Sequence, residues 1–176
     1  MTRILTAGVQ LKYQFTGKNI ALISRRQFLP NGDWKNVEMI SHPGAVCIVP
    51  FLDPNRIVLM RQYRPVLKTY IYELPAGTVD EKENLLVCAR RELREETGYI
   101  AKRWKRLGKI YPLPAYSNEQ ILIYKAEMLR LAQTDRDEDE IIEVKPMTLA
   151  QVRRLFLAGK IIDAKTICAL TFSGIL

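Results

Sequence analysis

The chain has 176 residues, a length that suits one domain, or one domain with a small appendage, and allows a sizeable buried core. A hydrophobic content of 48% excludes a disordered protein, and 9 Gly with 9 Pro exclude a fibrous one. The 27 Lys and Arg exceed the 19 Asp and Glu and give a net charge of +8, which suits a nucleic acid, an anionic membrane surface or a small phosphorylated substrate.

No apolar stretch reaches the roughly 20 residues that cross a bilayer, because the longest uncharged one, 39–52, is interrupted by two prolines and a glycine. Residues 2–10 are too few and too mixed to form a signal peptide. The three cysteines, Cys47, Cys88 and Cys168, are widely spaced, so we expect buried reduced thiols rather than a zinc site or disulfides. We therefore expect a soluble cytoplasmic protein with no membrane partner.

The first 40 residues alternate short apolar runs with turn signals. We expect strands at 9–15, 20–26 and 37–40, joined by turns at 16–19 and 30–33. So small an antiparallel sheet is marginal by itself and must pack against something else.

From residue 41 onward, longer strands alternate with helices. Strands are expected at 45–51, 56–62, 70–74, 106–111, 120–129 and 141–146, and helices at 84–97, 149–158 and 165–173. The first helix has the clearest boundaries, with Asn84 as N-cap and Gly98 at the C-terminal position. This interleaving predicts a mixed α/β fold.

Three carboxylates share one face of that first helix, because Glu92, Glu95 and Glu96 stand at positions i, i+3 and i+4. Like charges so close repel one another, and near a helix C-terminus they also oppose the helix dipole. Bound cations would offset both costs, and oxygen ligands favour Mg²⁺ or Mn²⁺, which in turn favour phosphate substrates. The alternative is a solvated acidic face paired with neighbouring arginines such as Arg91.

The segment from Gly77 to Tyr99 resembles the Nudix box, whose pattern is Gly, five residues, Glu, seven residues, Arg-Glu-aliphatic-x-Glu-Glu-x-Gly-aliphatic. Every charged and glycine position is present, and Tyr99 at the last, aliphatic position is the one departure. The resemblance implies a Nudix-type α/β/α sandwich with a mixed β-sheet over residues 41–176. A small N-terminal antiparallel sheet over residues 1–40 would precede it and serve dimerisation and contact with the substrate base.

Further blocks resemble the subgroup that hydrolyses ADP-ribose and related nucleoside diphosphate sugars. These blocks are 42–46, 61–64 and 73–77, together with Pro114, which lies 15 residues beyond the box. The Ser-Pro-Gly usual around that proline reads Leu-Pro-Ala here, which leaves the sugar preference open. Tyr116 is instead similar to a tyrosine of the dinucleoside polyphosphate subgroup.

The resemblance also implies roles for individual residues. The metal ligands would be Glu92, Glu95, Glu96 and the backbone carbonyl of Ala76, holding Mg²⁺ or, as a substitute, Mn²⁺. A pair formed by Glu83 and Arg91 would order the loop against the helix. The substrate contacts would be Arg64 on the diphosphate, Trp34 stacked on the base, and Pro114 and Glu119 in the later loop.

A general base that takes a proton from the attacking water is expected in the acidic run 137–144. Pairing the strand that follows with the family's pattern favours Glu140, and some members use the position of Glu138. A merely solvated acidic loop is the alternative reading. In that case a box glutamate such as Glu95, or Glu119, would be the substitute.

The predicted activity is metal-dependent hydrolysis of a nucleoside diphosphate sugar to a nucleoside monophosphate and a sugar phosphate, by a homodimer. Two other classes stay open, a hydrolase of dinucleoside polyphosphates or RNA 5′-pyrophosphate and a non-catalytic module that senses ADP-ribose. The cation-rich segment 102–109 contains a single aromatic residue, Trp104, which disfavours a nucleic acid partner.

Overall fold

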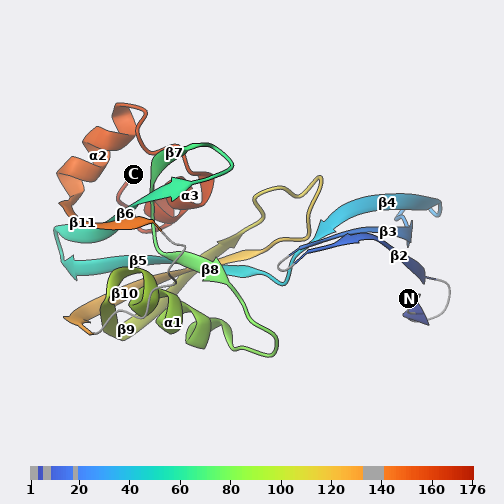
Figure 1. Cartoon of the computed structure of the whole chain (residues 1–176), viewed down its shortest axis with the longest axis horizontal. Coiled ribbons are helices and arrows are strands. Elements are labelled where there is room, and N and C mark those ends of the chain that lie inside the picture. The colour runs from blue at the N-terminus through green and yellow to red at the C-terminus, as the bar shows by residue number, and fades with distance from the viewer. Residues whose placement is uncertain (1–3, 6–8, 18–19, 133–140) are drawn as a thin grey trace. The chain divides into compact units, whose positions relative to one another are not determined.

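The computed structural model describes residues 4–5, 9–17, 20–132 and 141–176 (Figure 1). The chain forms two compact units. One comprises residues 1–44 and 111–120, and the other comprises 45–110 and 121–176. The loop around Pro114 therefore belongs to the same unit as the N-terminal sheet.

The N-terminal unit is an antiparallel sheet of four strands in sequential order: β1 (Ile4–Leu5), β2 (Val9–Thr16), β3 (Ala21–Phe28) and β4 (Trp34–Ser41). The predicted strands over 9–15, 20–26 and 37–40 are confirmed, although the last begins at Trp34. The expected turn at 30–33 is present, with Gly32 at a φ of 89°. The loop 111–120 joins the sheet where the amide of Ile40 donates to the carbonyl of Tyr116 (2.7 Å).

The larger unit contains a seven-stranded mixed sheet in which β11, β6, β5, β10 and β9 lie in that order, β7 pairs with β6, and β8 pairs with β5. The strands are β5 (Ala45–Asp53), β6 (Arg56–Arg64), β7 (Thr69–Glu73), β8 (Ala76–Thr78), β9 (Tyr99–Ile110), β10 (Ile121–Leu131) and β11 (Ile142–Thr148). The β5 and β10 strands run parallel, and the other pairs are antiparallel.

Helices cover both faces of this sheet (Figure 1). In β5, Cys47 and Val49 pack with α2 (Leu149–Leu157) and α3 (Ala164–Phe172), whereas Val46 and Ile48 pack with α1 (Leu85–Thr97). Successive side chains of a strand point to opposite faces, so one wholly apolar strand serves two cores. The predicted α/β/α sandwich is confirmed.

Besides the short β1 strand, which was not predicted, three details differ from the sequence prediction. The β9 strand begins at Tyr99 rather than 106. Its first half is rich in exposed basic residues, as an edge strand can be, and lacks the apolar run that signals a buried strand. The short β8 strand was not predicted, since Pro75 read as a break. Cys47 and Cys88 are buried free thiols as expected, but Cys168 is only partly buried.

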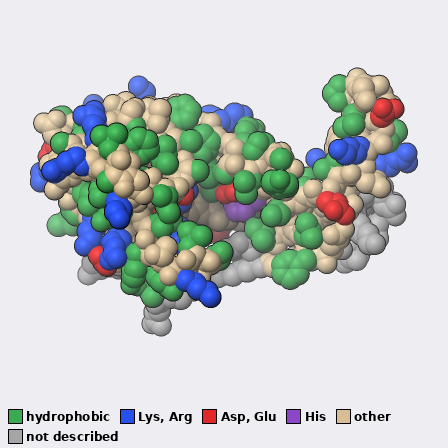
Figure 2. Space-filling model, turned by 90° about the horizontal axis from the view of Figure 1, so that it is seen from above, with side chains coloured by type: hydrophobic (Ala, Val, Ile, Leu, Met, Phe, Trp, Pro, Cys, Tyr) green, Lys and Arg blue, Asp and Glu red, His purple; other side chains and the backbone are tan. Residues whose placement is uncertain are grey.

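No helix in the described parts of the chain is long and apolar enough to span a membrane. On the face shown in Figure 2, Lys and Arg side chains are scattered among apolar ones rather than gathered in one patch. The net charge of +8 is thus not concentrated on that face.

Candidate active site

A split between two strands positions the backbone of the site. The β5 and β6 strands pair directly only near Phe51 and Ile57, and beyond that point the β7–β8 segment lies between them. Ala76 therefore pairs with Cys47 of β5, and the amide of Ile48 donates to the carbonyl of Pro75 (2.8 Å). These bonds fix the Ala76–Gly77 backbone on the sheet, where α1 packs against β5 and β8.

Both ends of α1 are capped as the sequence predicts. The side chain of Asn84 accepts a hydrogen bond from the amide of Leu86 (2.9 Å). At the other end, Gly98 takes a left-handed conformation (φ 72°), and its amide donates to the carbonyl of Arg94 (2.9 Å). The caps satisfy terminal backbone groups and hold the helix in one register relative to the loop that precedes it.

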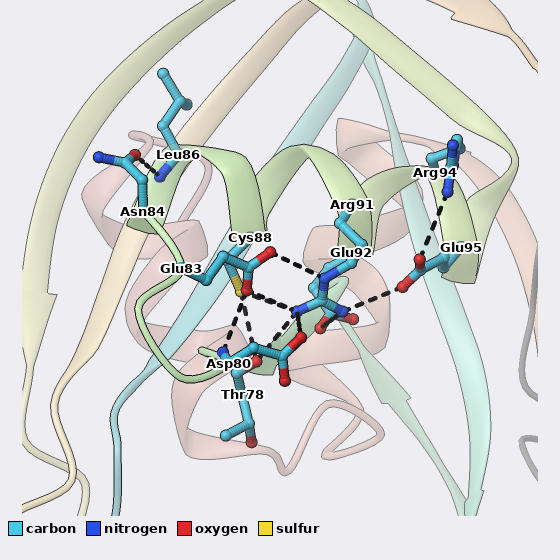
Figure 3. A network of polar contacts seen from close by, with 10 residues as sticks. All are labelled: Thr78, Asp80, Glu83, Asn84, Leu86, Cys88, Arg91, Glu92, Arg94 and Glu95. Carbon is cyan, nitrogen blue, oxygen red and sulfur yellow. Dashed lines mark hydrogen bonds and ion pairs between the residues drawn. The ribbon is translucent and has the colours of Figure 1, made fainter.

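The expected contact between Glu83 and Arg91 is present and orders that loop (Figure 3). Arg91 donates from Nε to Oε1 of Glu83 (3.1 Å) and from Nη2 to Oε2 (3.0 Å). Its Nη2 also donates to the carbonyl of Thr78 (3.3 Å). The hydrogen bonds from Arg91 lower the pKa of Glu83 to about 2, so Glu83 stays charged at neutral pH.

The three box carboxylates lie around this arginine and the Ala76 backbone. Nη1 of Arg91 donates to Oε1 of Glu92 (2.7 Å) and to Oε2 of Glu95 (3.1 Å), as Figure 3 shows. Glu96 is 3% exposed, and its Oε2 accepts the amide hydrogen bond of Ala76 (2.9 Å). The structure thus brings together all four predicted metal-site residues in one unit, with Arg91 in contact with two of the carboxylates.

Gly77 brings the strand backbone against one of these carboxylates. A β-carbon at this position would lie 1.9 Å from Oε1 and 2.4 Å from Oε2 of Glu92. Only glycine allows this approach. Because Gly77 has no side chain, it leaves room for the carboxylate of Glu92.

The four predicted ligands suit a hard divalent cation, because they offer three carboxylates and one backbone carbonyl, all oxygen donors. Within the described ranges, however, no three Asp, Glu, His or Cys side chains form a ready-made metal cluster. The guanidinium of Arg91 lies between two of the carboxylates, donating to Glu92 and to Glu95. The chemistry of these residues fits a divalent metal ion.

Arg64, the predicted diphosphate contact, lies at the end of β6 and is held by a buried carboxylate. Its Nε donates to Oε1 of Glu73 (2.5 Å) and its Nη2 to Oε2 (2.7 Å). Glu73 is 1% exposed, whereas the Arg64 side chain is 38% exposed. Glu73 also accepts a hydrogen bond from Lys165 of α3. Sequence reasoning missed this contact of Lys165, because nothing local to residue 165 shows that α3 begins beside β7.

The other predicted substrate contacts lie in the smaller unit of the chain. Trp34, Pro114 and Glu119 belong to the N-terminal unit. Trp34 is 45% exposed and contacts the ring of Phe28 (centroids 5.2 Å apart) and the guanidinium of Arg26. Glu138 and Glu140, the predicted bases, lie outside the described residues.

An α/β/α sandwich that presents the carboxylates of one helix beside a strand glycine defines a Nudix-type protein. The sequence profile of the NUDIX domain matches residues 41–170, and the chain belongs to this family. Nudix hydrolases generally need divalent metal ions.

Individual relatives cover most of the chain. It is 36% identical over 160 residues to an ADP-ribose pyrophosphatase of Bacillus subtilis, covering 90% of this chain and 86% of the relative. It is 34% identical over the same length to a methanol dehydrogenase activator of Bacillus methanolicus, with the same coverage. A crystal structure of an ADP compounds hydrolase superimposes with a TM-score of 0.78 at 24% identity, covering 98% of this chain and 91% of that chain. The last similarity establishes the fold alone.

Proposed function

We propose that this protein hydrolyses the pyrophosphate bond of ADP-ribose or a related nucleoside diphosphate sugar to a nucleoside monophosphate and a sugar phosphate. The complete Nudix box carries the proposal, because its three carboxylates lie on one helix face beside the Ala76–Gly77 backbone. The name of the Bacillus subtilis relative supports the choice of substrate.

In this proposal Glu92, Glu95, Glu96 and the carbonyl of Ala76 hold Mg²⁺, or Mn²⁺ as a substitute. Such a cation supplies positive charge at the diphosphate and lowers the pKa of a bound water. The protein positions the ligands, with Gly77 leaving room for Glu92 and the Ala76 amide orienting Glu96. Arg64 binds a diphosphate oxygen through a guanidinium of fixed orientation.

Glu140 takes the proton of the attacking water in this scheme, and Glu138 is the second candidate. Oxygen from water forms a new bond to phosphorus while the bridging P–O bond breaks, and the leaving phosphate departs as a monoester. A general base in reach of that water contributes about 10²–10⁴-fold to the rate. Pro114 and Glu119 are proposed to contact the substrate from the N-terminal unit's loop.

A homodimer formed through the N-terminal sheet is part of the proposal. Strand register places Phe15, Leu22 and Ile40 in one row of a sheet face, and Phe28 and Trp34 in another row of the same face. Phe15 is 60% exposed and Phe28 is 53% exposed, so the face offers apolar area for a second copy to cover. Light scattering should give twice the monomer mass at micromolar concentration, and a monomer mass would contradict the dimer.

A cytoplasmic location also belongs to the proposal, since the three cysteines are free and suit a reducing compartment.

A substrate panel tests the proposed activity. The purified protein would be assayed with ADP-ribose, GDP-mannose, a dinucleoside polyphosphate and 5′-triphosphorylated RNA, each with Mg²⁺ or Mn²⁺. We expect the highest kcat/KM on a nucleotide sugar. Preference for the dinucleoside polyphosphate or the RNA would assign the enzyme to another subgroup, and binding of ADP-ribose without turnover would make it a sensing module.

A further inference from the structure

Four side chains of alternating charge form a row at the end of β7, next to the segment that carries Ala76. Arg64 at the end of β6 donates two hydrogen bonds to Glu73 at the end of β7. Lys165 in the first turn of α3 contacts the same Glu73 carboxylate, and its Nζ lies 3.0 Å from Oδ2 of Asp163. Exposure of the side chains is 38% for Arg64, 1% for Glu73, 17% for Lys165 and 16% for Asp163. Arg64 is therefore the most solvent-exposed member of the row.

The same turn of α3 is joined to the backbone of the site. Asp163 caps α3 by accepting the amide hydrogen bond of Thr166 (2.9 Å), and the Thr166 hydroxyl accepts the amide hydrogen bond of Leu74 (2.9 Å). Leu74 lies two residues before Ala76. The start of α3 thus supports both the arginine and the strand segment that carries the box glycine.

The charges of the row sum to zero, and this sum determines the net charge near a bound diphosphate. Glu73 is needed to orient Arg64, but an uncompensated buried carboxylate would repel an anionic substrate and cancel the arginine's charge. Lys165 offsets that carboxylate by contacting Oε2, the oxygen that also accepts a hydrogen bond from Nη2 of Arg64. With Lys165 neutral, Arg64, Glu73 and Asp163 would together carry one negative charge.

We infer that Lys165 is a positioning residue for substrate binding, which acts through Glu73 to keep Arg64 oriented and its positive charge available to a substrate diphosphate. This inference rests on the proposed function, in which Arg64 contacts that diphosphate. Lys165 itself touches no reacting atom in this scheme.

Paired substitutions with opposite effects on charge test the role. Lys165→Met removes the positive charge and keeps much of the side-chain length, and it should raise the KM for ADP-ribose about tenfold while kcat changes less than about threefold. Lys165→Arg, which keeps the positive charge, should return KM to the wild-type value.

Asp163→Asn keeps the helix cap but leaves the row with one extra positive charge, so it should lower the KM for ADP-ribose. Lys125→Met, which breaks the ion pair of Lys125 with Glu127 elsewhere in the unit, is the matched control and should leave KM unchanged.

The outcomes separate this role from a structural one and from the proposed function. If Lys165 had only a structural role, Lys165→Met and Asp163→Asn would both lower the melting temperature and leave the KM of the folded enzyme unchanged. That result would overturn the inference. If Lys165→Met does not fold, Asp163→Asn decides, and a KM that is unchanged or raised overturns the inference. If the wild type hydrolyses none of the panel, the proposed function fails, and calorimetric binding of ADP to the same variants tests the row independently. Unchanged ADP affinity in Lys165→Met would then overturn the inference.

Discussion

Gly77 and Glu92 are so close that a β-carbon on the glycine would lie 1.9 Å from the carboxylate oxygen Oε1. The atoms that such a β-carbon would meet are the far end of a flexible side chain, and φ at Gly77 is not among the positive values that only glycine adopts readily. The backbone can therefore accept alanine, and the carboxylate must move instead.

This relationship predicts the effect of Gly77→Ala. The variant should fold with a melting temperature close to the wild type's while kcat falls by roughly a hundredfold, because Glu92 is displaced from its place in the site. Gly108→Ala is the control for a clash away from the carboxylates, since its β-carbon would lie 2.7 Å from the Phe172 ring, and it should leave kcat intact. Wild-type kcat in folded Gly77→Ala would contradict the role given to Glu92.

The buried carboxylate of Glu73 predicts a pH dependence of stability. Burial alone would raise its pKa, but the hydrogen bonds and charges of Arg64 and Lys165 outweigh burial and hold the pKa below its ordinary value of 4.5. A lowered pKa in the folded state means that the stabilisation is fully present above pH 4.5 and is lost as the pH falls through the folded-state value.

Urea unfolding from neutral to acidic pH measures this effect. Glu73→Gln should lower the free energy of unfolding at pH 7 by about 3 kcal/mol, because Arg64 and Lys165 lose their shared anion. The variant should also lose less stability on acidification than the wild type does. Equal acid losses in the two proteins would show that Glu73 does not carry the effect.

The fold could be predicted closely from the sequence, and the site only in part. The caps Asn84 and Gly98, the box spacing and the apolar β5 strand are local signals, and each of them is confirmed. The contacts of Glu73 with Lys165 and of Leu74 with Thr166 join residues 92 positions apart, so no local pattern could reveal them. The β8 strand was missed because Pro75 read as a break, and its three residues gain their place only by pairing with the distant β5 strand.

The general base is the prediction that depends most on sequence alone. Glu140→Gln should lower kcat about 10²–10⁴-fold while metal and substrate binding persist, since a base acts only in the chemical step. Glu138→Gln should have a milder effect. A larger loss in Glu138→Gln would shift the assignment by two residues, and wild-type kcat in the double variant would place the base elsewhere, with Glu95 or Glu119 as the substitutes.

Trp34 is predicted to stack on the base of the substrate. Trp34→Ala should raise KM more than it lowers kcat, because stacking stabilises the ground state and the transition state alike. Phe28→Ala removes the neighbouring ring, whose centroid lies 5.2 Å from that of Trp34, and should change KM less. Equal changes in KM would assign the effect to the apolar face as a whole rather than to Trp34.

The most direct test of metal-dependent pyrophosphate hydrolysis is product analysis of ADP-ribose turnover with and without a divalent cation, in the wild type and in Glu96→Gln. With Mg²⁺ or Mn²⁺ the wild type should release AMP and ribose 5-phosphate. Excess chelator, or loss of the Glu96 carboxylate, should lower kcat by roughly a hundredfold or more. Full turnover in excess chelator, or unchanged turnover in Glu96→Gln, would contradict the role of the box carboxylates as metal ligands.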